Sequence, residues 1–232
     1  MESETVRLGV RVWIRKQISA LLMTALLLFL AAGTLKWPLA WLQLVLYTVS
    51  VLFQGLLLGR INPALLAERS ALQKGTKKWD IFMLSVGVGL LPLVAWLVAG
   101  LDFRFGWSTP MPGWQIALGV FFWVLGYALI IWAMAVNAFF STSVRIQEER
   151  GHHVIDRGPY GVVRHPGYVG AIIFQLATPF LLSSWWALIP SVLSALIYVI
   201  RTVLEDRTLQ NELPGYREFT KRTRYRLLPG IW

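Results

Sequence analysis

Residues 105–144 read FGWSTPMPGWQIALGVFFWVLGYALIIWAMAVNAFFSTSV and contain no charged side chain. Gly and Pro residues concentrate in the first part of this stretch, which predicts a loop followed by a helix that begins near Gly113. About 20 apolar residues are enough to cross the roughly 30 Å hydrocarbon core of a bilayer. The rest of the stretch therefore predicts a membrane-spanning helix.

Further charge-free stretches lie on both sides of this one. Gln17–Leu35, Trp37–Gly59 and Ile81–Leu101 each have the length of one span. His165–Ile200 is interrupted near Ser183–Trp185 and predicts a hairpin with arms of about 16–18 residues, or roughly 24–27 Å. Arms this short require a thinned bilayer or shielding by neighbouring helices. We therefore expect an all-α polytopic membrane protein with about six transmembrane helices, including a short C-terminal hairpin.

The composition excludes an ordinary soluble domain. The chain has 232 residues, of which 56% are hydrophobic and 15% charged, against roughly 25% charged in soluble domains. Its mean hydropathy is +0.57. There is no Cys, which excludes disulfides and thiolate chemistry, and there are three His. No metal site is predicted, because His152 and His153 are adjacent and point differently, and no acidic pair has ligand spacing.

The net charge of +10 has a strongly one-sided distribution along the predicted spans. With the N-terminus inside, 20 of the 22 Lys and Arg residues fall on one side, and the exceptions are Lys36 and Arg104. The positive-inside rule then predicts six crossings with both termini and the polar loops in the cytoplasm. The basic charge is explained by topology and by attraction to anionic lipids. We therefore expect no nucleic-acid partner, and a location in a bacterial inner membrane.

The chain divides into two regions. Residues 1–138 are interpreted as an N-terminal amphipathic helix followed by membrane spans, and residues 139–232 as the region that carries the polar segments and the candidate catalytic site described below. Near the N-terminus an apolar face and a basic face alternate with helical periodicity, which favours a helix lying on the membrane surface over a cleaved signal peptide. These faces are Val6, Val10, Trp13 and Ile14, and Arg7, Arg11 and Arg15.

Ionisable residues gather in two segments, Arg145–Tyr168 and Arg201–Trp232. Both segments border the predicted hairpin, so the hairpin brings them together at one membrane face. Arg201 and Glu205 are four residues apart and share a helix face, which is compatible with a simple ion pair. Ionisable groups at this depth are also functional candidates. From the residues alone, a solvated loop and a polar binding site both remain open for the first segment.

The order of short motifs in these segments resembles the isoprenylcysteine carboxyl methyltransferase family, which is itself similar to phospholipid methyltransferases. The motifs are Gly158-Pro-Tyr160, Arg164-His-Pro-Gly-Tyr168-Val-Gly170, Arg201-x-x-x-Glu205-Asp206, Gly215-Tyr-Arg-Glu-Phe219 and Tyr225-Arg-Leu-Leu-Pro-Gly-Ile-Trp232. The resemblance covers about residues 139–232, whereas the earlier spans match only as apolar segments.

The resemblance implies an integral-membrane methyltransferase that uses S-adenosylmethionine and a lipid or prenylated acceptor, with cytoplasmic cofactor-binding loops. It implies catalytic roles for Arg201 and Glu205, with Arg201 as the substrate contact. By motif position, the cofactor contacts fall on Gln147, His152, His153, Val154, Ile155, Tyr160, His165, Pro166, Gly167, Tyr168 and Glu205. The arginine fork suits a carboxylate acceptor, and Glu205 suits the ammonium of the cofactor.

Three alternatives remain open at this stage. A phospholipid amine is a possible acceptor, but a protonated amine must lose a proton before it attacks. A nicotinamide-dependent membrane sterol or enone reductase would need further basic residues for a cofactor phosphate. A non-catalytic membrane scaffold is compatible with the plain N-terminal half, but not with the dense polar segments.

Overall fold

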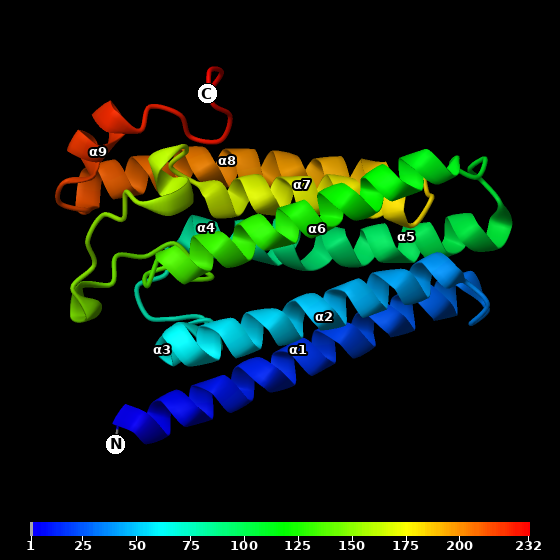
Figure 1. Cartoon of the computed structure of the whole chain (residues 1–232), viewed down its shortest axis with the longest axis horizontal. Coiled ribbons are helices and arrows are strands. Elements are labelled where there is room, and N and C mark those ends of the chain that lie inside the picture. Colours follow the sequence, from blue (N-terminus) through cyan, green and yellow to red (C-terminus); the bar gives the residue numbers. More distant parts are fainter. Residues whose placement is uncertain (1) are drawn as a thin grey trace.

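The computed structural model describes the backbone of residues 2–232 and the side chains from residue 4 onward. All regular elements in this part of the chain are helical. In chain order they are α1 (Glu2–Ala32), α2 (Pro38–Ile61), α3 (Pro63–Glu68), α4 (Lys78–Met83), η1 (Leu84–Leu90), α5 (Leu91–Phe105), α6 (Gly113–Val136), η2 (Glu148–Arg150), η3 (Gly158–Gly161), α7 (Pro166–Leu181), α8 (Leu188–Glu212) and α9 (Tyr216–Arg222). Figure 1 shows the long helices running side by side along one axis of the molecule.

Five helical segments of the described chain are long and apolar enough to span a membrane. They are α1, α2, the continuous α4–η1–α5 segment, α6 and α8. The sixth apolar helix, α7, has only 16 residues, which agrees with the short hairpin arm expected from the sequence. The fold class predicted from the charge-free stretches, an all-α polytopic membrane protein, is confirmed.

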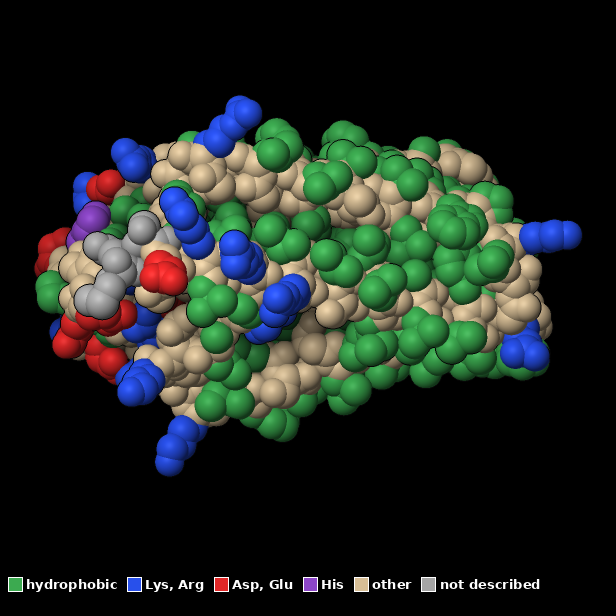
Figure 2. Space-filling model, turned by 90° about the horizontal axis from the view of Figure 1, so that it is seen from below, with side chains coloured by type: hydrophobic (Ala, Val, Ile, Leu, Met, Phe, Trp, Pro, Cys, Tyr) green, Lys and Arg blue, Asp and Glu red, His purple; other side chains and the backbone are tan. Residues whose placement is uncertain are grey.

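The six helical segments alternate in direction, so their connections fall at two ends of the bundle. Residues 62–77, 137–165 and 213–232 lie at one end, which we call the motif end, and the N-terminus lies there too (Figure 1). Residues 33–37, 106–112 and 182–187 connect helices at the opposite end. Figure 2 shows apolar side chains along the flank and most charged side chains at the motif end.

The second arm of the hairpin is longer than expected. The apolar stretch ends at Ile200, but α8 continues for three more turns to Glu212. The predicted length of about 16–18 residues was wrong for this arm, which has 25 residues. The end of an apolar stretch marks a change of environment and does not mark the end of a helix. Arg201 and Glu205 consequently lie within a rigid helix.

The N-terminal residues do not form a separate helix on the membrane surface. Helix α1 is continuous over 31 residues. Its apolar side packs against α3: Trp13 is 5% exposed and shares a cluster with Leu65 and Leu66. A Cβ added to Gly9 would lie 2.5 Å from the Cβ of Ala67. Trp13 and Val10 of the predicted face therefore pack against another helix, whereas Ile14 stays exposed. This tertiary contact is not contained in the local sequence pattern.

Helix α7 is held between α6 and α8 by close backbone contact. A Cβ on Gly126 of α6 would lie 2.7 Å from the carbonyl oxygen of Gly170, and a Cβ on Gly170 would lie 2.6 Å from that of Gly126. Small residues allow this approach in membrane helices. The contact holds the start of α7, with its N-cap His165 and first-turn Tyr168, against the second half of α6.

A π-helical turn, η1, joins α4 to α5 and faces α8. The carbonyl of Gly87 accepts a hydrogen bond from Ser194 Oγ at 2.6 Å, and Ser194 in turn accepts one from Gln175 at 2.9 Å. A Cβ on Gly87 would clash with Ile197, so this glycine serves helix packing, as its position inside a span predicts. The packing directs the start of α4 toward Arg201.

The hairpin turns where the sequence predicts. At that end of the bundle, Asp102 of α5 links the hairpin turn to the loop that follows α5. Its carboxylate accepts hydrogen bonds from the backbone and side chain of Ser108 at 2.7 and 2.6 Å and from Ser184 at 2.5 Å. Asp102 is thereby fully engaged in a structural role, away from the motif end.

Candidate active site

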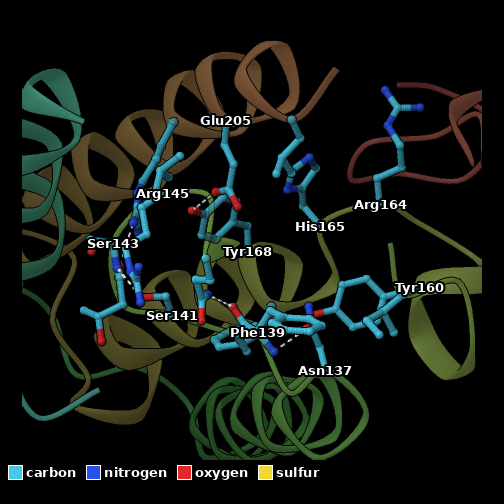
Figure 3. Close-up of a pocket in the computed structure, with 18 of the residues that line it drawn as sticks. Asn137, Phe139, Ser141, Ser143, Arg145, Tyr160, Arg164, His165, Tyr168 and Glu205 are labelled. Carbon is cyan, nitrogen blue, oxygen red and sulfur yellow. Dashed lines mark hydrogen bonds between the residues drawn. The ribbon is translucent and has the colours of Figure 1, made fainter. Parts of the chain in front are cut away.

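A cavity of about 210 Å³ lies at the motif end, between the last turns of α6, the first turn of α7, the middle of α8 and α9 (Figure 3). Its wall includes residues from both polar segments predicted to meet. Among the predicted site residues, those lining it are Gln147, His152, His153, Val154, Ile155, Tyr160, His165, Gly167, Tyr168, Arg201 and Glu205. Pro166 is buried in the first turn of α7 beside the lining residues.

Phe139 forms an aromatic wall of the cavity. Its ring centroid lies 4.7 Å from that of His152 and 4.9 Å from that of His153. Its backbone N–H donates to Asn137 Oδ1 at 2.8 Å, and the amide of Asn137 donates to the Tyr160 hydroxyl at 3.1 Å. Burial raises the pKa of Tyr160, so the phenol stays protonated and neutral at physiological pH.

Gln147 braces the loop from inside. It is 1% exposed, donates from Nε2 to the Phe139 carbonyl at 2.7 Å and accepts from Arg150 at 2.5 Å. Its backbone N–H donates to His152 Nδ1 at 3.3 Å. Burial, together with the nearby His153, Arg145 and Arg150, lowers the pKa of His152 to about 4. His152 is therefore neutral near pH 7, with Nδ1 as an acceptor.

Glu205 reaches into the cavity from α8 (Figure 3). Its carboxylate accepts a hydrogen bond from the hydroxyl of Tyr168. The Tyr168 ring is stacked on His165, with centroids 5.7 Å apart and planes 5° apart. None of the ion pairs among the described side chains involves Glu205, so a carboxylate without a cationic partner faces the cavity.

Arg201 pairs with Asp80 of α4 and not with Glu205. Its Nε lies 2.6 Å from Asp80 Oδ1 and its Nη2 lies 3.1 Å from Oδ2, and Nη2 also donates to the Thr142 carbonyl at 2.7 Å. Asp80 is 0% exposed and Arg201 4%. The Asp80 carboxylate also accepts from the backbone of Val144 at 2.6 Å. This ion pair ties α4, α8 and the loop after α6 together.

The simple i,i+4 ion pair considered from the sequence is thus replaced by a pair that crosses the bundle. The edge formed by Nε and Nη2 of Arg201 is already occupied by a protein carboxylate. The guanidinium carbon also lies 5.1 Å from the Tyr168 ring centroid. Both residues of the Arg201-x-x-x-Glu205 motif therefore converge on Tyr168.

Asp206, the next residue of that motif, anchors the end of the chain. It is 0% exposed and accepts from Arg164 at 2.8 Å, Arg226 at 2.9 Å and Tyr216 at 3.1 Å. His165 Nε2 lies 3.4 Å from the same carboxylate. Because these partners come from both polar segments, the order of motifs in the sequence corresponds to one interconnected cluster in space.

Sequence reasoning missed several residues of the site, chiefly from the region before residue 139. Asp80, Arg69 and Asn137 were not named, although Arg69 and Asn137 line the cavity. Asp80 carried a usable signal, because it directly precedes a charge-free span and ionisable groups there are functional candidates. Arg69 gave no such signal, because nothing in the sequence distinguishes it from the other basic residues of the same loop.

Comparison with known proteins agrees with the motif analysis. Residues 117–211 match the model of the isoprenylcysteine carboxyl methyltransferase (ICMT) family. The resemblance to the ICMT family is confirmed. This family match indicates a methyltransferase that is similar to protein-S-isoprenylcysteine O-methyltransferases, and it gives no support to the reductase or scaffold alternatives.

A solved structure of an ICMT protein has a similar fold. It is described as the eukaryotic intramembrane Ras methyltransferase ICMT, and the match has a TM-score of 0.61 with 18% identity, covering 93% of this chain and 75% of the other. At this identity the match shows a shared polytopic membrane fold. No curated protein sequence matches the chain.

Proposed function

We propose that this membrane protein transfers a methyl group from S-adenosylmethionine to the carboxylate of an isoprenylcysteine-like or other isoprenoid lipid. The observation that carries the proposal is the Glu205 carboxylate, which lines the cavity close to Arg201 and has no ion-pair partner among the side chains that the structure describes. The ICMT family match supports the reaction class. The identity of the methyl donor, the identity of the acceptor and the roles of the residues are proposed here.

The residues of the cavity fit S-adenosylmethionine. Glu205 can bind the ammonium of the amino-acid end, since a hydrogen bond between a carboxylate and a cationic donor is strong. The rings of Phe139 and Tyr168 provide faces suited to adenine or to the sulfonium cation. The irregular backbone between residues 147 and 165 offers N–H and C=O groups to the remaining polar edges. When bound, the cofactor supplies an activated methyl group.

A carboxylate acceptor requires little proton chemistry from the protein. Its oxygen is already an anion, so the enzyme has to hold acceptor and donor in line at near-attack distance and exclude water. Arg201 contributes a fixed positive charge. The sequence predicted that the acceptor carboxylate binds the whole guanidinium fork. Because Asp80 holds the Nε–Nη2 edge, the acceptor instead meets the Nη1 side.

The cavity is also bordered by membrane helices. Leu84, Val88, Ile130 and Tyr198 line it from η1, α6 and α8. An isoprenoid tail would therefore stay among apolar side chains and lipid while its headgroup reaches Arg201. In the proposed orientation the motif end faces the cytoplasm, in agreement with the positive-inside rule.

The acceptor class is tested with purified protein, labelled methyl donor and a membrane lipid extract. We expect label in a lipid from which base releases it, because the product is a methyl ester. Base-stable label in a phospholipid would show the amine chemistry of the alternative reading and overturn the carboxylate proposal. Absence of transfer to both the extract and N-acetyl-S-farnesylcysteine would also overturn it.

The cofactor role of Glu205 is tested by direct titration of S-adenosylmethionine into the Glu205→Gln variant. Loss of a charge-assisted contact should weaken binding roughly 10- to 100-fold. Glu212→Gln serves as the matched control, because Glu212 lies on the same helix but pairs with Lys77 at the surface. Equal affinities in the two variants would remove Glu205 from the cofactor site.

A further inference from the structure

The charged side chains that line the cavity fall into two groups. Three arginines have carboxylate partners: Arg145 with Glu68 at 2.9 Å, Arg164 with Asp206 at 2.8 Å and Arg201 with Asp80 at 2.6 Å. Arg69 and Glu205 also line the cavity, and neither takes part in an ion pair among the described side chains. The wall thus presents one charge of each sign that has no ion-pair partner among the described side chains.

Arg69 is held in place by weak contacts. It follows α3 directly, and its guanidinium carbon lies 5.2 Å from the Phe140 ring centroid. Within the described chain its side chain makes one hydrogen bond, a long one of 3.4 Å from Nη1 to the Phe140 carbonyl. The adjacent carboxylate, Glu68, is already engaged by Arg145 at 2.9 Å. Most of the five donor hydrogens of this guanidinium are therefore available to a ligand.

The surroundings of Arg69 place it on the bilayer side of the cavity. The groups that act on it electrostatically are Tyr127, Tyr198, Arg201 and Tyr168, which belong to α6, α8 and α7. The nearby Leu84 and Val88 are apolar. Burial lowers the pKa of Arg69, yet a guanidinium remains charged in proteins. A partly buried cation beside a second guanidinium is costly without an anion, so the site is arranged to receive one.

We propose that Arg69 is a second contact, beside Arg201, that recognises the anionic headgroup of the acceptor, a carboxylate carried on an apolar tail. This inference rests on the proposed function and deepens it by naming a residue that recognises the acceptor, and this residue lies outside the family match at residues 117–211. Glu205 and Arg69 then divide the work, the first binding the cationic end of the donor and the second the anion of the acceptor. The apolar helices beside Arg69 accommodate the tail.

The test measures equilibrium binding to the purified protein, without turnover. The probes are N-acetyl-S-farnesylcysteine and its carboxamide, which share the tail and differ in the charge of the headgroup. The wild type should bind the carboxylate roughly 10- to 100-fold more tightly than the carboxamide, as for hydrogen bonds to a charged group. Arg69→Gln should lose this preference and Arg69→Lys should recover part of it.

Arg60→Gln is the matched control, because Arg60 is exposed at the end of α2 and does not line the cavity. It should keep the wild-type preference. A full carboxylate preference in Arg69→Gln would overturn the inference and leave the proposed function intact. If the wild type shows no carboxylate preference, the carboxylate acceptor of the proposed function fails instead.

A second titration, with S-adenosylmethionine, separates the two anions that Arg69 can meet. Arg69→Gln should bind the donor within about twofold of the wild type. A tenfold or greater loss of donor affinity, with the carboxylate preference retained, would assign Arg69 to the carboxylate of the cofactor and overturn the acceptor role.

Discussion

Arg201 and Glu205 lie one helical turn apart on α8 but have different partners, Asp80 and Tyr168. The difference matters because the Asp80–Arg201 pair is almost completely buried. Removing one member of a buried pair leaves an uncompensated charge and typically costs about 3–5 kcal/mol. The pair therefore stabilises the site as well as orienting Arg201.

The first residue-scale prediction concerns this pair. Asp80→Asn and Arg201→Gln should each lower the midpoint of thermal unfolding strongly, and the double variant should lose much less than the sum, because no buried charge is left alone. Asp156→Asn is the control, since its pair with Arg222 is exposed and worth at most about 1 kcal/mol. Additive losses in the double variant would contradict the coupling.

The second residue-scale prediction concerns pH. The pKa of His152 is lowered from 6.5 to about 4 in the folded protein, so the unfolded chain binds more protons between these values. Stability should therefore fall as the pH drops from about 6.5 toward 4. His152→Asn keeps an acceptor for the Gln147 N–H and should flatten this part of the pH profile of thermal unfolding.

His153→Asn is the comparison for that experiment. Burial is the main cause of the low pKa of His152, and it remains in this variant, so the acid dependence should persist. A His152→Asn variant with the same acid dependence as the wild type would show that other groups cause it.

Among the elements, the hairpin and the spans could be predicted because hydrophobic length is a local property of the sequence. The turn near Ser183–Trp185 and the short α7 followed from it. The continuity of α1 and the length of α8 did not, since Trp13 meets α3 and α8 extends beyond its apolar stretch. The same limit applies to the site: motif residues were found, whereas Asp80 and Arg69 reach it by tertiary packing.

The element-scale prediction concerns the contact between α6 and α7. Gly170→Ala places a Cβ 2.6 Å from the carbonyl oxygen of Gly126 and 3.0 Å from the backbone N of Ile130. Overpacking of this kind costs about 1–3 kcal/mol, and moving α7 shifts its first turn, which lines the cavity. Lower thermal stability and weaker cofactor binding are expected together.

Gly59→Ala is the matched control for this substitution. Gly59 is also helical, but an added Cβ would meet nothing within 4 Å. This variant should be neutral or stabilised by up to about 1 kcal/mol, since Ala is the better helix former. Similar behaviour of the two variants would show that the α6–α7 contact is loose.

The loops that connect the helices lie at two opposite ends of the molecule, and this arrangement predicts the membrane topology. The chain has no Cys, so single cysteines can be placed at Lys74, Arg104 and Ile231, all exposed. A membrane-impermeant maleimide applied to intact cells should label the Arg104→Cys variant, and the other two only after lysis. Labelling of Lys74→Cys in intact cells would reverse the proposed orientation.

The Asp80–Arg201 pair also has a consequence for biosynthesis. The two residues are 121 positions apart, so at 5–20 residues per second the ribosome needs roughly 6–24 s to make the second after the first. During this interval the third span already exists, with its carboxylate at the membrane boundary and no guanidinium to meet it. Final docking of the third span thus waits for the last one, and in a nascent chain arrested between them the Asp80 carboxylate lacks its buried partner.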